Sequence, residues 1–234
     1  MATLAQADQP PLLFSGQRLD REEFYRRVDE FVARGGNPRG IERLEQRVQM
    51  PQPIPLTFHG EPQGHMVAWL GHYVAATRGC QGSGSATVVL DADNDPEPDC
   101  VLRIRPEYGG ESRTDRSGYV DGAPELVVEV ADSTAVTDLQ LKFEIYRRNG
   151  VLEYLVWETI AEDFYWFVLQ EGEYHRVSPD ADGVIHSRVY PGLWLDVTAL
   201  LKGDLARVLA VVQQGVASPE HAEFVARLDG QRKS

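Results

Sequence analysis

The chain has 234 residues, and 42% of them are hydrophobic, which excludes a disordered chain and predicts a globular protein large enough to bury a core. Its 36 acidic and 23 basic side chains give a net charge of −13, so it does not coat nucleic acid through a basic surface, and any contact with DNA must depend on a local site. It shows no apolar run near the ~20 residues of a membrane span, no signal-peptide pattern at its start and only two cysteines, so we expect a cytoplasmic protein with no membrane contact and no disulfide framework.

The first predicted element is a helix that follows a flexible tail of residues 1–18. Asp20 is a suitable N-cap, an apolar stripe at helical spacing begins at Phe24, and the pair Gly35–Gly36 ends the helix. Residues 41–50 are ambiguous, because their apolar side chains suit a helix by spacing while the segment is short and stops at a proline.

A clear amphipathic helix covers residues 65–78 and ends at a glycine. The glycines that follow, Gly82 and Gly84, are interpreted as a flexible connector. They lead to a strand over residues 86–91, which a turn rich in Asp and Asn joins to a second strand over residues 99–104. This pattern predicts a β-hairpin.

The nearly continuous apolar segment of residues 125–131 predicts a central strand that is covered on both faces. A helix over residues 138–148, stopped by Asn149–Gly150, and a strand over residues 153–158 follow it. Strand, helix and strand at this spacing form a βαβ unit, so we expect the two strands to be parallel.

The rest of the chain predicts two more strands, over residues 163–169 and 173–178, and two helices, over residues 198–214 and 218–229. The aromatic run of residues 164–167 is interpreted as sheet core rather than as a platform for stacking bases. The order of elements indicates an α/β fold, with a mixed β-sheet flanked by helices and with helical N- and C-terminal additions. Since the sequence shows no long linker or internal repeat, residues 19–234 are expected to form a single domain.

Glu129 is the most unusual residue, because it carries a carboxylate inside the apolar segment 125–131. Burying a charge is costly unless the charge is paired or bound to a cation. Asp99 opens another predicted strand, and two carboxylates that meet at strand ends form the kind of oxygen site that Mg²⁺ prefers. The alternative is a solvent-exposed Asp99 and a Glu129 that is paired with an arginine.

Two further side chains, Lys142 and His65, are candidates for a catalytic role. Lys142 lies on the helix after the strand of Glu129, where a crossover can bring it to the end of that strand to orient a water or neutralise a phosphate. His65 begins the early helix and could be an acid–base group or a phosphate contact. The alternatives are a solvated lysine and a histidine that caps or packs the helix.

Four short motifs follow one another in the chain: Pro98–Asp99, APELVVEV (residues 123–130), a helix with Lys142 and Tyr146, and NGVLEYLVWE (residues 149–158). Together they resemble a large bacterial family of restriction-endonuclease-like proteins in the PD-(D/E)xK nuclease superfamily. The resemblance covers most of the chain, from the first helix to the C-terminal helices.

This resemblance implies a restriction-endonuclease-like fold and hydrolysis of DNA phosphodiester bonds that depends on Mg²⁺ or Mn²⁺. It also implies that Asp99 and Glu129 are metal ligands, together with the backbone carbonyl of Val130. The superfamily's lysine falls at Ala131, which is a departure from the motif, and Lys142 matches a lysine that takes its place in this family.

Two more residues match positions of the family. His65 matches a histidine at the start of the family's early helix, so the resemblance implies that it belongs to the catalytic set. Glu45 matches an acidic residue that a glycine usually follows, whereas Gln46 follows it here.

The residues and the resemblance together predict a metal-dependent endonuclease, in which Asp99 and Glu129 hold the metal and Lys142 positions the nucleophile. The pair Arg147–Arg148 on the same helix could form a local basic strip for DNA. We expect a homodimer, because cutting both strands of a duplex needs two sites. The alternatives are a binding or scaffold protein that keeps the fold without turnover, which Ala131 favours, and an enzyme for another phosphodiester or nucleotide.

Overall fold

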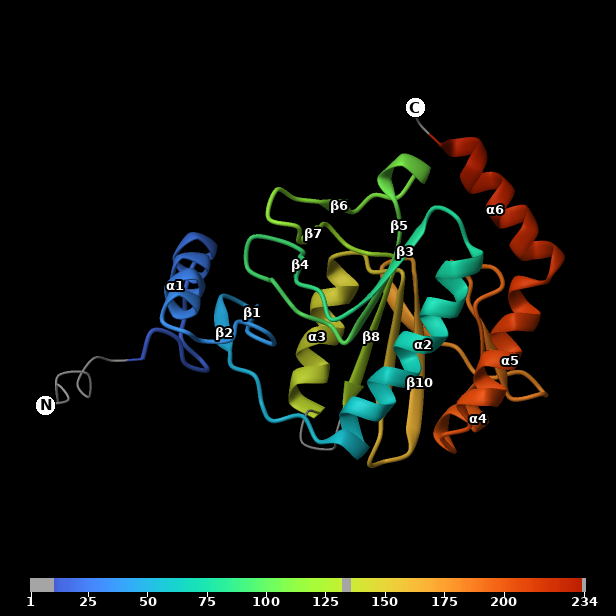
Figure 1. Ribbon diagram of the computed structural model, residues 1–234, viewed down its shortest axis with the longest axis horizontal. Coiled ribbons are helices and arrows are strands. Elements are labelled where there is room, and N and C mark those ends of the chain that lie inside the picture. The colour runs from blue at the N-terminus through green and yellow to red at the C-terminus, as the bar shows by residue number, and fades with distance from the viewer. Residues whose placement is uncertain (1–10, 132–135, 233–234) are drawn as a thin grey trace, which may run out of the picture.

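A computed structural model describes residues 11–131 and 136–232 (Figure 1). Its strands are β1 (Glu42–Leu44), β2 (Arg47–Gln49), β3 (Cys80–Gly84), β4 (Val88–Val89), β5 (Cys100–Ile104), β6 (Arg113–Thr114), β7 (Val120–Asp121), β8 (Leu126–Ala131), β9 (Glu153–Glu158), β10 (Asp163–Gln170), β11 (Glu173–Arg176), β12 (Val184–His186) and β13 (Trp194–Asp196). Its α-helices are α1 (Arg21–Ala33), α2 (Glu61–Ala76), α3 (Val136–Arg148), α4 (Val197–Leu201), α5 (Leu205–Val216) and α6 (Pro219–Gln231). A π-helical turn, η1 (Leu56–Gly60), precedes α2, and a 3₁₀ turn, η2 (Pro106–Tyr108), follows β5.

The main sheet has six strands in the order β11-β10-β9-β8-β5-β3, so that β8 lies inside the sheet. β8 and β9 are parallel, from Leu126 opposite Glu153 to Ala131 opposite Glu158. All other neighbours in this sheet are antiparallel. The mixed sheet flanked by helices confirms the predicted fold class, and the predictions of a central β8 and of a parallel β9 are confirmed as well.

The two faces of the main sheet are covered by different helices, because side chains alternate along each strand. The even-numbered side chains of β8 join the main core, to which α2 contributes Trp69. Val127 points to the opposite face and packs with Tyr146 of α3 and Tyr154 of β9. Figure 1 shows β8 between α2 and α3, and this two-sided burial explains why the sequence of β8 is almost entirely apolar.

α1 and the β1–β2 hairpin lie at one end of the long axis of the molecule (Figure 1). Asp20 caps α1 as predicted, by accepting a hydrogen bond of 2.9 Å from the N–H of Glu23. The ambiguous residues 41–50 form this hairpin and no helix, because the turn residues Glu45 and Gln46 take positive φ angles of 50° and 62° that suit a tight two-residue turn. A small separate core holds this end together and consists of Leu13, Leu19, Phe24, Val28, Ile41 and Val48.

Part of the predicted tail is packed. Leu13 is buried in the small core, and the N–H of Gly16 donates to the carbonyl of Val48 at 2.8 Å. Residues 1–10 of that tail lie outside the described residues. The first described residues are therefore attached to the β1–β2 hairpin.

The predicted hairpin of residues 86–91 and 99–104 is wrong. Gly82 and Gly84 belong to β3, an edge strand that pairs with β5, and are not a connector. β4 pairs instead with β7 in a small three-stranded sheet. Gly84 is needed because α2 packs closely on β3. A Cβ atom at this position would lie 2.8 Å from the side chain of Val67 in α2.

The predicted C-terminal helices are present, but the first of them is divided. α4 ends before Gly203, which has a φ of 72°, and Asp204 then caps α5 by accepting from the N–H of Arg207 at 3.0 Å. The antiparallel pair β12 and β13 before α4 is an addition that the sequence did not reveal. In the described ranges, no helix has the length and apolar character needed to cross a membrane.

Candidate active site

Glu129 lies in β8 on the face of the sheet that α3 covers, and only 6% of its surface is exposed. Lys142 of α3 donates to both of its carboxylate oxygens, at 3.0 and 3.1 Å. The hydroxyl of Tyr146 donates to Oε1 at 2.7 Å. Lys142 and Tyr146 are one helical turn apart, so the crossover that places α3 over β8 presents both to Glu129.

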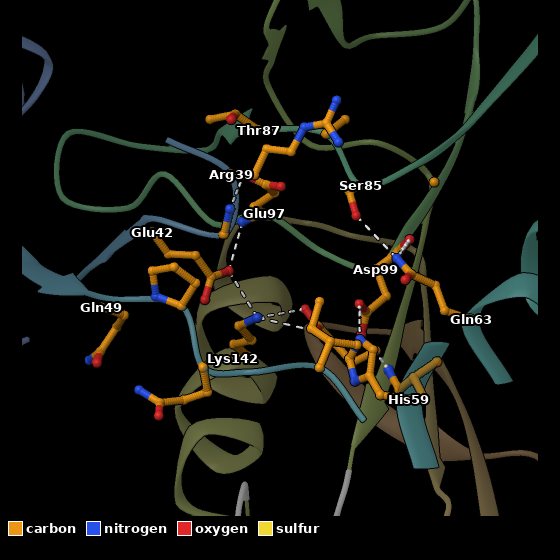
Figure 2. Close-up of a pocket in the computed structure, with 18 of the residues that line it drawn as sticks. Arg39, Glu42, Gln49, His59, Gln63, Ser85, Thr87, Glu97, Asp99 and Lys142 are labelled. Carbon is orange, nitrogen blue, oxygen red and sulfur yellow. Dashed lines mark hydrogen bonds and ion pairs between the residues drawn. The ribbon is translucent and has the colours of Figure 1, made fainter. Parts of the chain in front are cut away.

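Lys142 also contacts a second carboxylate, which comes from the N-terminal hairpin. Its Nζ lies 2.9 Å from Oε1 of Glu42, and the N–H of Glu97 donates to that same oxygen at 2.7 Å. Figure 2 shows the side chains of Glu42 and Lys142 pointing toward each other from different elements. An ammonium group has three donors and can serve both carboxylates at once. Lys142 is thus held between Glu129 and Glu42.

Asp99 lies directly before β5 and is oriented by hydrogen bonds on both of its oxygens. Oδ2 accepts from the N–H of Val130 at 2.7 Å, which fixes the carboxylate beside β8. Oδ1 lies 2.8 Å from Nε2 of His59, a residue of the η1 turn (Figure 2). The antiparallel pairing of Cys100 with Val128 places Asp99 at the level of Glu129 on the neighbouring strand.

The predicted metal ligands and Lys142 line one cleft of about 1280 Å³. Asp99, Glu129, Val130, Ala131 and Lys142 all belong to its lining. The lining also includes the N-terminal hairpin, the proline-rich segment that leads from it to η1, the start of α2, residues 84–87, Glu97 and residues 118–119. The cleft is therefore formed by several segments that lie far apart in the chain.

The charged side chains of this cleft shift one another's pKa values. Burial raises the pKa of Glu129, and the nearby charges of Asp99 and Glu42 raise it further, while Lys142 acts in the opposite direction. Burial by itself lowers the pKa of Lys142, but the charges of Glu129 and Glu42 outweigh it and hold that pKa above its usual range. Lys142 is therefore a permanent cation beside a carboxylate that binds a proton more readily than a free one.

The donor set of the cleft fits a hard divalent cation. Asp99 and Glu129 offer carboxylate oxygens on neighbouring strands, and Mg²⁺ in proteins commonly uses one or two carboxylates and keeps several waters. No three His, Cys, Asp or Glu side chains converge on one point anywhere in residues 11–131 and 136–232, as they would in a closed zinc site. The two carboxylates of Asp99 and Glu129 are thus suited to a hard cation such as Mg²⁺.

Two residues singled out by the sequence lie elsewhere. His65 stacks on Trp157, with ring centroids 6.4 Å apart, and is not among the residues that line the cleft. Glu45 forms an ion pair with Arg148 of α3 and is also absent from the cleft lining. A catalytic role for His65 stays a prediction.

Sequence analysis missed Glu42 and His59, which do reach the site. Glu42 was not predicted because the apolar residues of segment 41–50 have helical spacing. In the observed hairpin, the side chain of Glu42 points toward Lys142 and that of Glu45 points away from it. The tight turn at Glu45 and Gln46 gave no signal in the sequence, because neither residue is a typical former of a two-residue hairpin turn. His59 lies in an irregular turn that no periodicity indicates.

The two arginines that follow Lys142 on α3 have acidic partners. Arg147 donates to Glu144 at 2.8 Å and pairs with Glu173 at 3.1 Å, and Arg148 pairs with Glu45. The predicted basic strip is therefore largely neutralised by carboxylates in the molecule.

Comparison with known proteins agrees with this geometry. Residues 22–198 match the Uma2 family model, which is described as "Putative restriction endonuclease". Among solved structures, the chain is similar to a crystal structure of a "putative nuclease belonging to DUF820" from Anabaena variabilis, with a TM-score of 0.57, 15% identity, and coverage of 75% of this chain and 97% of that chain. At this identity the likeness shows a shared fold. No curated protein matches the chain.

Proposed function

The chain belongs to the Uma2 family of putative restriction endonucleases, and from this premise we propose that it is a metal-dependent endonuclease that hydrolyses phosphodiester bonds in DNA. The observation that carries the proposal is the single cleft that Asp99, Glu129 and Lys142 line together. The cation would be Mg²⁺ or Mn²⁺, because both accept carboxylate and carbonyl oxygens.

Asp99 and Glu129 would hold this cation, with the backbone carbonyl of Val130 as a further ligand. The hydrogen bonds that Asp99 shares with the N–H of Val130 and with Nε2 of His59 support this role, because they orient its carboxylate before any ligand arrives. When bound, the cation would polarise the scissile phosphate and lower the pKa of a coordinated water.

Lys142 would position the attacking water and offset the negative charge of the phosphate. Ala131 holds the superfamily's lysine position and carries no charge, but it lines the same cleft as Lys142. The stem of Lys142 is buried, so its ammonium is held in place and reaches the cleft from α3 rather than from β8. This supports a lysine that has moved to the helix.

Glu42 would act as a positioning residue for Lys142. With Glu129 alone as partner, the ammonium would be drawn fully onto a metal ligand. The second contact at 2.9 Å to Glu42 holds it between the two carboxylates instead. The N–H of Glu97 in turn fixes Glu42.

We further propose that residues 19–234 act as one domain and that the active form is a homodimer. One chain supplies one cleft with this residue set, and a duplex has two strands to cut. The burial of Leu13 supports a domain that begins slightly before residue 19.

Incubation of the full chain with supercoiled plasmid and with single-stranded DNA tests this function. We expect cleavage with Mg²⁺ or Mn²⁺, none with a chelator, and none for Glu129→Gln, which keeps the size of the side chain. Failure of the wild-type chain to cut either DNA with any divalent cation would contradict the proposal and favour the scaffold alternative.

A further inference from the structure

A second pocket, of about 620 Å³, lies between α3 and the strands β9 and β10. Its lining is mainly aromatic, from Phe143, Tyr154, Tyr165 and Phe167, with the polar side chains of Gln140 and Glu158 among the remainder. Nothing in the proposed hydrolysis uses these residues.

The pocket arises from the alternation of β10. Phe164 and Trp166 face the main core, whereas Tyr165 and Phe167 face the side of α3 and remain partly exposed. The prediction that the whole run of residues 164–167 is sheet core is therefore correct for one face only. The rings of Tyr165 and Phe167 are parallel within 1° and 6.2 Å apart, and Phe143 packs edge-on against Phe167 at 5.1 Å. These rings form a rigid aromatic wall.

Polar groups of this pocket have no partner within the described part of the chain. Tyr154 is completely buried, and its hydroxyl forms no hydrogen bond there. The side chains of Glu158 and Gln140 form no hydrogen bond or ion pair with other described residues either.

The pocket is adjacent to the cleft. Ala131 of the cleft is the parallel partner of Glu158, and consecutive residues of α3 supply Lys142 to the cleft and Phe143 to the pocket. Neighbouring strands are roughly 4.8 Å apart, so β10 lies roughly 10 Å from β8. This span corresponds to one or two nucleotides of an extended strand.

We propose that this pocket binds a nucleobase with an exocyclic amino group, from the same strand whose phosphate enters the cleft. This inference rests on the proposed function. The aromatic wall stacks on the base, and the acceptors on Glu158 and Gln140 receive its amino hydrogens. The carboxylate of Glu158 repels a phosphate, so the base and not the backbone enters. Arg176 lies at the rim of the pocket, with its guanidinium 4.3 Å from the ring centroid of Tyr165 and 3.5 Å from the carboxylate of Asp163.

Binding of fluorescein-labelled oligonucleotides of deoxycytidine, deoxyadenosine or thymidine to the full chain tests the proposal. Anisotropy is measured with Ca²⁺ in place of Mg²⁺, so that the readout does not require cleavage. Loss of one stacked base corresponds to roughly 5- to 150-fold weaker binding. We expect a loss of this size for Tyr165→Ala with deoxycytidine, wild-type binding for Tyr165→Phe, and wild-type binding for Phe14→Ala, which removes an exposed ring elsewhere. Glu158→Ala should reduce the preference for deoxycytidine over thymidine.

The outcomes separate this proposal from the nuclease proposal. If the wild type cleaves DNA and Tyr165→Ala binds all oligonucleotides as tightly as wild type, the base pocket is wrong and the nuclease stands. If the wild type never cleaves but binding depends on Tyr165, the nuclease is wrong and the base pocket stands. A Tyr165→Ala chain that changes from dimer to monomer in sedimentation without losing affinity would show a self-association surface and overturn the proposal. A wild type that neither binds nor cleaves would contradict both.

Discussion

Replacing Lys142 with methionine removes one charge from the centre of the cleft and keeps most of the unbranched stem. In the wild type, Nζ lies 3.0 and 3.1 Å from the oxygens of Glu129 and 2.9 Å from Glu42. The variant leaves these two carboxylates near each other without their cation. We therefore expect Lys142→Met to lose both cleavage and stability.

The two losses have different sizes. Removing one preorganised electrostatic contact lowers the rate by roughly 10²–10³. Removing one partner of a buried ion pair lowers the free energy of unfolding by roughly 3–5 kcal/mol. The stability loss should lie near the lower end, because Glu129, whose pKa burial already raises, can take up a proton in the variant. A change that removes no core volume is thus still destabilising here.

Single-turnover plasmid cleavage and urea unfolding measure the two effects separately. Lys202→Met, at the exposed C-cap of α4, is the matched control and should behave as wild type in both. Adding Glu42→Gln to Lys142→Met should recover part of the stability and none of the cleavage. Wild-type cleavage by Lys142→Met would refute the assignment of the lysine, and unfolding like that of Lys202→Met would refute the buried ion pair.

Three further predictions concern other parts of the molecule. Burial raises the pKa of Glu153 from 4.5 to about 6, so the folded chain holds this proton more tightly than the unfolded chain. The free energy of unfolding should therefore fall by about 2 kcal/mol in total as the pH rises from about 3.5 to about 7, with most of the fall between the two pKa values, and Glu153→Gln should flatten this part of a urea-unfolding pH profile. Asp95→Ala leaves the fully buried Arg43 without its 2.6 Å partner and should destabilise the chain by roughly 3–5 kcal/mol in calorimetry, and a cost below 1 kcal/mol would contradict this. Neutralising Arg147 and Arg148 leaves their carboxylate partners without a cation and makes α3 more negative, so DNA that crosses α3 should bind more weakly and with a smaller salt dependence. An unchanged slope of affinity against salt would show that DNA does not cross α3.

The central part of the fold could be predicted because its signals are local and strong. The apolar run of β8, the helix α3 and the strand β9 follow one another within a short stretch, and the handedness of the crossover fixes how they pack. The pairing of β3 with β5 could not be predicted, because β3 contains three residues without a large side chain, Gly82, Ser83 and Gly84, and its glycines serve contacts with α2 that only the assembled fold shows.

The part of the candidate site that lies on β8 and α3 could also be predicted from the sequence. Glu129 is conspicuous as a charge inside an apolar strand, and Lys142 follows it at crossover distance. Glu42 comes from a hairpin more than 50 residues before Asp99 and reaches the cleft only because Arg43 is anchored to Asp95 beside it. Such a long-range ion pair has no periodic pattern. The aromatic pocket could not be predicted for a related reason. Residues 164–167 are all aromatic, so the sequence does not show which of their two faces a helix covers fully and which stays partly exposed.

The most direct test of the metal-dependent cleft is a crystal structure of the wild-type chain soaked in Mn²⁺, with its anomalous scattering measured. We expect a peak between Asp99 and Glu129 with oxygen ligands at roughly 2.1–2.2 Å, and no peak there in Glu129→Gln crystals. A cleft without anomalous density at saturating Mn²⁺, in a preparation that cleaves DNA, would contradict it.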